Sequence, residues 1–121
     1  MLDRGFLSSY AGVPAEVACV RHEVWSYLAD SPVADDVALV VSELASNAIM
    51  HSNSAGGIFT VRVDRRDDHI YIEVQDDGGP WVRLIDESRL HGLDILTLLA
   101  PHWGVMGTDT CRVVWARVPC S

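Results

Sequence analysis

The sequence contains no lysine. All nine of its basic residues are arginine, and 17 acidic residues bring the net charge to −8. Without lysine the chain cannot carry a Walker-type phosphate loop, whose pattern GxxxxGK[ST] requires one. The acidic balance argues against a nucleic-acid partner, since such proteins turn basic faces toward phosphate. If this chain binds a nucleotide, it must hold the phosphates by another arrangement.

Long apolar runs and paired cysteines are also missing. No stretch approaches the roughly 20 apolar residues of a membrane span. The first ten residues, MLDRGFLSSY, lack the apolar segment of a signal peptide. Cys19, Cys111 and Cys120 have no metal-binding spacing, so we expect three reduced thiols, two in the core and one near the terminus. These absences predict a cytoplasmic protein with no membrane partner.

The sequence has enough apolar residues for one hydrophobic core. Its length of 121 residues, 49% hydrophobic content and lack of repeats or linkers predict a single domain over residues 1–121. Hydrophobic spacing and turn residues predict helices and strands in the order α, α, β, β, α, β, β. Their ranges are 14–29, 33–51, 59–63, 70–74, 92–100, 103–108 and 112–118, and a short edge strand over residues 6–10 is left open. Because the helices are grouped and do not alternate with strands, we expect an α+β fold with helices layered on one sheet.

Three polar residues follow the apolar stripe of the second predicted helix. Glu43, Asn47 and His51 recur at four-residue steps along the border of that stripe. An amide oxygen is a hard ligand for Mg²⁺, and a carboxylate can accept a proton from an attacking hydroxyl. Such residues more often face solvent, and a histidine at a helix end can simply favour the helix dipole. This stretch alone leaves both interpretations open.

Two glycine-containing segments follow further along the chain. Asp76 ends a predicted strand and opens the turn DDGGP, which contains Gly78. A carboxylate there can accept a hydrogen bond from an exocyclic amine while a planar base approaches the glycine, although ordinary turns use aspartate too. Gly92, followed by Leu93, opens the third predicted helix. Free N–H groups at that helix start could bind an anion, or the glycine could mark only the start.

In their order along the chain, these segments resemble the histidine kinase-like (GHKL) ATPase superfamily. The matching stretches are ELASNAIMH, VQDDGG, HGLDIL, HWGV and RVVWARV. They are most similar to the small anti-sigma-factor serine kinases, and the resemblance covers about residues 13–118. It implies a two-layer α/β sandwich in which helices cover one face of a mixed sheet, with ATP and Mg²⁺ as cofactors. It also implies a sigma factor and its antagonist as protein partners, and leaves open a homodimer.

The resemblance assigns a role to each matching position. Glu43 corresponds to the general base that activates a serine of a partner protein, and Asn47 to the Mg²⁺ ligand. Asp76 corresponds to the carboxylate that binds the amine of adenine. Arg83 and Arg89 lie between the two glycine segments, where a guanidinium suits a phosphate as well as a solvated loop. The further nucleotide-binding positions in this prediction are His51, Gly78, Arg89, Gly92 and Leu93.

Two positions depart from the family pattern and keep alternative functions open. Pro80 stands where the first glycine segment normally ends in glycine, and proline has no N–H and cannot adopt a positive φ. Leu90 replaces the first glycine of the second segment. The chain is therefore predicted to be either a Mg-ATP-dependent protein serine kinase or a catalytically impaired ATP-binding or protein-binding module. An ATP hydrolase or small-molecule kinase has no substrate site to support it.

Overall fold

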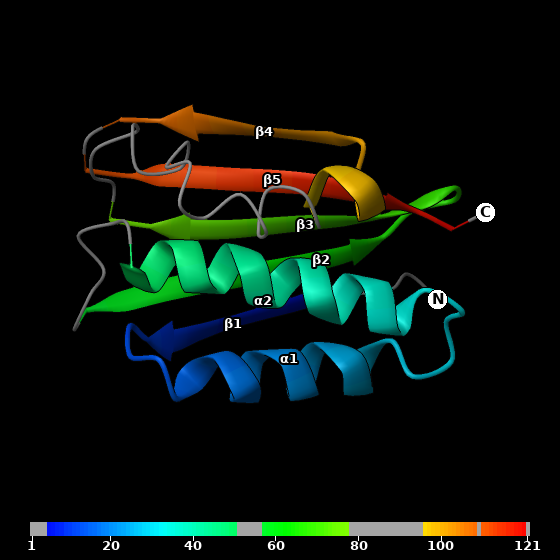
Figure 1. Ribbon diagram of the computed structural model, residues 1–121, viewed down its shortest axis with the longest axis horizontal. Helices are drawn as coiled ribbons and strands as arrows, with labels where there is room; N and C mark the ends of the chain where they lie inside the picture. The colour runs from blue at the N-terminus through cyan, green and yellow to red at the C-terminus, as the bar shows by residue number, and fades with distance from the viewer. Residues whose placement is uncertain (1–4, 51–56, 78–95, 109, 121) are drawn as a thin grey trace.

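The computed structural model describes residues 5–50, 57–77, 96–108 and 110–120 (Figure 1). Its elements in chain order are β1 Phe6–Ala11, α1 Glu16–Tyr27, α2 Ala34–Met50, β2 Ile58–Arg65, β3 His69–Asp76, β4 His102–Gly107 and β5 Arg112–Pro119. Residues 96–99 are also helical, within the range predicted for the third helix. Each predicted element is confirmed where the structure describes it, with boundaries shifted by a few residues.

Alternation of apolar and polar side chains explains the strands. In β2, Phe59, Val61 and Val63 are fully buried, while the residues between them are at least partly exposed. The turn between β2 and β3 is closed by the amide of Arg66, which donates to the carbonyl of His69 at 2.9 Å. Apolar residues on one face of each strand thus provide a continuous surface for the helices to cover.

The sheet has the strand order β1-β2-β3-β5-β4, and every neighbouring pair is antiparallel. The prediction of a mixed sheet is therefore wrong for these strands. Two helices follow β1 in series and return the chain to the end of the sheet where β1 finished, so β2 leaves in the opposite direction (Figure 1). The close β2–β3 turn reverses the chain again, as antiparallel pairing requires.

Both long helices lie on one face of this sheet (Figure 1). α2 packs against β2, β3 and β5, while α1 packs against α2 and β1. The core between the layers contains Val20 and Val24 of α1 and the buried positions of α2, including Val37, Val41 and Leu44. This arrangement confirms the expected α+β class and the layer of helices on one sheet.

Two of the three cysteines do not lie in the core, as the sequence predicted they would. Cys19 and Cys111 are exposed, and Cys120 is partly buried, although all three are free thiols as expected. Cys19 is exposed on α1, whereas its neighbour Val20 is fully buried. Cys111 lies outside the strands, immediately before β5. Among the helices that the structure describes, none is both long and apolar enough to cross a membrane.

Candidate functional site

Three elements finish or begin at the same end of the sheet. α2 ends at Met50, β3 ends at Asp76 and β5 begins at Arg112, all at the left of Figure 1. α2 also packs directly against β3. The fold therefore brings the last turns of α2 to the end of the sheet where the predicted base-binding aspartate lies.

Glu43 and Asn47 occupy the border of the α2 core stripe. Both are half-buried, and their neighbours Leu44 and Ala48 are buried in the core. This placement agrees with the spacing of residues around an ideal helix, which puts these polar side chains at the edge of the apolar stripe. Asn47 lies less than one helical turn from the end of α2 and Glu43 one turn earlier. Their roles in binding and catalysis remain predictions.

Asp76 is buried and paired with an arginine that the sequence reasoning missed. Asp76 is 3% exposed and Arg112 is 0% exposed. The two residues are direct cross-strand partners in the β3–β5 pair. Arg112 donates from Nε at 3.2 Å and from Nη2 at 2.8 Å, in both cases to Oδ2 of Asp76. A charge-assisted pair of this kind is stronger than a neutral hydrogen bond and fixes the orientation of the carboxylate.

The alternation of β5 could have revealed Arg112. Val114, Ala116 and Val118 are buried on the side of the strand that faces the helices, and Arg112 continues that series by two residues. An arginine at an inward position is costly to bury unless a carboxylate pairs with it. The sequence predicted the strand over residues 112–118, but the prediction gave Arg112 no partner.

A tight hairpin sets the position of Arg112 at the start of β5. Gly107 ends β4 with a φ of +123°, a backbone conformation that residues other than glycine rarely adopt. A Cβ at Gly107 would collide with the carbonyl of Cys111 and lie 2.9 Å from the Cα of Arg112. The amide of Thr108 donates to that same carbonyl at 2.7 Å. The close approach of β4 and β5 at this turn thus depends on glycine at position 107.

The remaining predicted ligands lie outside the described residues. His51, Gly78, Arg89, Gly92 and Leu93 belong to this group, as do Pro80 and Leu90. Within the described ranges, no group of three or more His, Cys, Asp or Glu side chains could hold a metal ion. That finding is compatible with a Mg²⁺ ion carried by a nucleotide, because Mg²⁺ keeps several waters and needs only one or two protein ligands beside phosphate oxygens.

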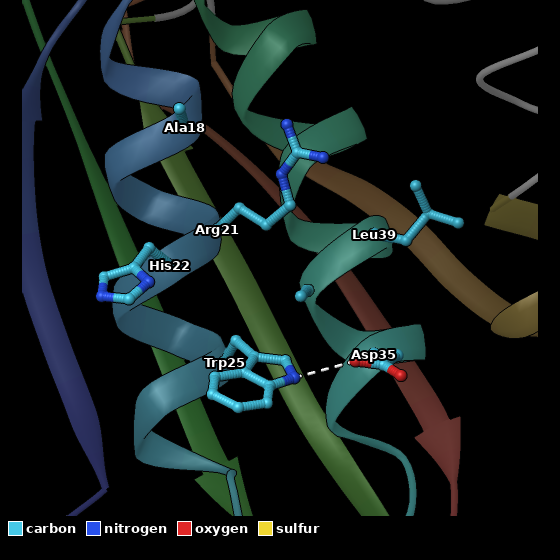
Figure 2. A pocket seen from close by; sticks show the side chains of 7 residues that line it. Ala18, Arg21, His22, Trp25, Asp35 and Leu39 are labelled. Atoms are coloured by element: carbon cyan, nitrogen blue, oxygen red, sulfur yellow. Dashed lines mark hydrogen bonds between the residues drawn. The ribbon is translucent and has the colours of Figure 1, made fainter.

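A separate groove lies between α1 and α2 (Figure 2). It has a volume of about 470 Å³, and its lining residues are Ala18, Arg21, His22, Trp25, Asp35, Ala38 and Leu39. The indole of Trp25 donates to Oδ1 of Asp35 at 2.8 Å and so ties the two helices together across the groove. None of the predicted site residues lines this groove, so it is distinct from the end of the sheet where Asn47 and Asp76 lie.

Comparison with known proteins agrees with this architecture. The crystal structure of the RsbU and RsbW domains of Rv1364c from Mycobacterium tuberculosis superposes with a TM-score of 0.71 and 16% identity. The match covers 93% of this chain but only 32% of that one, so the likeness shows the fold alone. No curated protein matches the sequence. Residues 11–92 match the histidine kinase-like ATPase domain, and this range is more than half of the chain. The chain therefore belongs to the histidine kinase-like ATPase domain family.

Proposed function

We propose that this chain is a regulatory protein that binds Mg-ATP at the end of the sheet where α2 and β3 finish and β5 begins. Family membership supports the choice of nucleotide. The observation that carries the proposal is that the last turns of α2, which contain the half-buried Glu43 and Asn47, end at the same end of the sheet as β3 with its buried Asp76. Such a site combines an acceptor for a base, a hard ligand and a half-buried carboxylate.

Each of the three side chains has a distinct task in this proposal. Asp76 accepts a hydrogen bond from the exocyclic amine of adenine. Asn47 would hold Mg²⁺ through its amide oxygen, and the ion would supply positive charge beside the phosphate oxygens. In phosphoryl transfer, the hydroxyl oxygen of a partner serine bonds to the γ-phosphorus, and the bond between that phosphorus and the ADP oxygen breaks. The hydroxyl proton passes to the Glu43 carboxylate.

The acceptor of the phosphoryl group is proposed to be a protein. The sequence resembles anti-sigma-factor serine kinases, and the similar structure contains a domain named RsbW. The net charge of −8 favours a partner with basic patches, because opposite charges steer encounter and fix orientation. A sigma factor and an antagonist of this protein in the cytoplasm are the partners that this resemblance implies.

Calorimetric titration with ATP, with and without Mg²⁺, tests the proposal. The wild-type protein should bind ATP in the micromolar range, and Asn47→Ala should lose most of the dependence on Mg²⁺. Ser46→Ala is the matched control. Ser46 is the half-buried neighbour of Asn47 on the same helix, and no role in binding ATP or Mg²⁺ is proposed for it. Absence of binding at millimolar ATP would reject the proposed nucleotide site.

A second function is favoured by Pro80 and Leu90, which replace expected glycines. In this alternative the chain acts through protein contacts and has lost part of its affinity for ATP. Leu90→Gly separates the two, because glycine restores backbone freedom and removes a bulky side chain. A gain of about tenfold or more in ATP affinity, or 1.4 kcal/mol, would support an impaired site. An unchanged affinity would show that Leu90 is not the cause of any impairment.

A further inference from the structure

We infer that two copies of this chain associate through the groove between α1 and α2, with Arg21 of each copy paired to Asp35 of the other. The groove shares no residue with the proposed nucleotide site. In Figure 2, Arg21 and Trp25 lie on the near side of the helices, and the strands lie behind. The inference therefore goes beyond the proposed function, and it can be tested without a nucleotide.

The groove exposes apolar surface that a single copy leaves in contact with water. Trp25 is 42% exposed and Leu39 is 37% exposed, and the small residues Ala18 and Ala38 line the groove beside them. Small side chains allow another chain to approach the helices closely. Tryptophan and arginine are the residues that most often contribute binding energy at protein interfaces. This groove contains both, since Trp25 follows Arg21 by one helical turn on α1.

Helix α1 presents a cation to the groove and α2 presents a carboxylate. Within the described residues, no carboxylate lies at ion-pair distance from Arg21. Asp35 lies further along the groove than Arg21, because its Oδ1 accepts a hydrogen bond from the indole of Trp25 at 2.8 Å. A carboxylate accepts more than one hydrogen bond, so Asp35 can keep the indole and also bind a guanidinium.

A two-fold axis across the groove satisfies both charges at once. In a symmetric dimer the same patch meets itself, so each contact between two different residues occurs twice. With the axis between Arg21 and Asp35, each guanidinium lies beside the Asp35 carboxylate of the second copy. Trp25 is bonded to Asp35, so its indole comes within reach of the same guanidinium, which can pair with a carboxylate and stack on an aromatic ring. The charges of the groove are thus complementary to a second copy of the same groove.

The size of the surface predicts a weak dimer. With 12 and 17 residues, α1 and α2 are about 18 and 25 Å long. A face of about 25 by 20 Å on each copy gives about 1,000 Å² in total, the lower limit for a specific interface. The net charge of −8 on each copy also opposes association. We therefore expect a monomer–dimer equilibrium with a dissociation constant of about 10–100 µM.

Sedimentation velocity of the full chain without nucleotide, at low salt and from about 5 to 300 µM, tests the inference. The wild-type protein should shift from monomer to dimer over this range. Arg21→Glu places two carboxylates together at each contact, and Asp35→Arg places two guanidinium groups there. Each variant alone should associate at least about tenfold more weakly than wild type, because like charges across an interface repel.

An equimolar mixture of the two variants gives the decisive result. In a mixed dimer, each substituted side chain meets an opposite charge and the remaining Arg21 meets the remaining Asp35, so association should return close to that of wild type. Asp35→Arg also removes the acceptor of the Trp25 indole, but it does so equally alone and in the mixture. A mixture that stays as weak as its components would overturn the pairing of Arg21 with Asp35.

Arg117→Glu is the matched control, because Arg117 is also exposed and the change of charge is the same, but it lies on β5 outside the groove. It should associate as wild type does. An equal loss in Arg117→Glu and Arg21→Glu would assign the effect to net charge and overturn the inference. A wild-type protein that remains monomeric at the highest concentration would also overturn it, leaving the groove to a different protein or to solvent. None of these outcomes bears on the proposed binding of ATP.

Discussion

At the scale of single residues, two tyrosines should lower the stability of the protein as the pH becomes alkaline. Burial and a hydrogen bond to Glu23 raise the pKa of Tyr10 from 10.0 to about 12, and burial and a hydrogen bond to Glu73 do the same for Tyr71. The folded protein therefore holds these protons more tightly than the unfolded chain does. The free energy of unfolding should be unaffected by them below pH of about 10 and should fall as the pH rises toward about 12.

Urea unfolding across this pH range measures the effect. Tyr10→Phe and Tyr71→Phe should each reduce the loss of stability between the two pH values, because each removes one proton whose affinity differs between the folded and unfolded states. Tyr10→Phe should also cost about 1 kcal/mol at neutral pH, since its hydroxyl donates to Oε1 of Glu23 at 2.6 Å and links β1 to α1. An unchanged pH dependence in both variants would contradict the assignment.

Glu43 permits a second prediction at this scale. Glu43→Gln keeps the size of the half-buried side chain but removes the proposed base. Because a base acts in the transfer step, the affinity for ATP should stay within about twofold of wild type. Transfer of the radiolabelled γ-phosphate of ATP to proteins of a cell extract should fall about a hundredfold or more. Retained transfer would remove Glu43 from the mechanism, and Ser46→Ala serves as the control.

At the scale of elements, Arg65 connects the β2–β3 hairpin to the end of α1. Its Nη2 donates to the carbonyl of Tyr27 at 2.7 Å and to Oδ1 of Asp30 at 2.8 Å, and its guanidinium lies 5.0 Å from the centre of the Tyr27 ring. The pKa of Asp30 is lowered chiefly by this hydrogen bond, but Asp30 is exposed and its charge is screened by solvent. The carbonyl and the ring should therefore contribute most of the stabilisation.

Arg65→Ala should lower the free energy of unfolding by about 1–2 kcal/mol, measured in urea. Arg65→Lys should recover only part of that loss, because an ammonium cannot stack on the ring as a guanidinium does. Asp30→Asn is the control for the exposed partner and should leave the stability close to that of wild type. A larger loss in Asp30→Asn than in Arg65→Ala would show that the ion pair dominates.

The β4–β5 hairpin yields a prediction about two glycines. Gly107 has a φ of +123°, and backbone atoms surround the space of its missing Cβ. Gly104 has no such backbone constraint, and the atoms nearest to its missing Cβ belong to the side chain of Trp115. Gly107→Ala should therefore cost about 2 kcal/mol or more, and Gly104→Ala should cost less, because an indole can move where backbone cannot. Equal losses in thermal unfolding would argue against the hairpin constraint.

At the scale of the whole molecule, the sequence contained most of the fold and only part of the site. Hydrophobic patterns predicted the helices and strands correctly because each element buries one face. Examples are the helical spacing of Val20 and Val24 and the alternation of Phe59 with its neighbours. The prediction of a mixed sheet failed because strand direction depends on how the connections return the chain. The Asp76–Arg112 pair was missed because a contact across 36 positions comes from strand register, which local patterns do not contain.

Charge distribution over the molecule supports a last prediction, that the chain does not bind nucleic acid. Among the six arginines of the described residues, Arg62, Arg65, Arg66 and Arg112 each lie within ion-pair distance of a carboxylate. With a net charge of −8, little positive potential is left for phosphates. Fluorescence anisotropy with labelled duplex DNA at physiological salt should show no binding. Binding that weakens steeply with added salt would reveal a basic surface that the net charge conceals, because release of counterions produces that dependence.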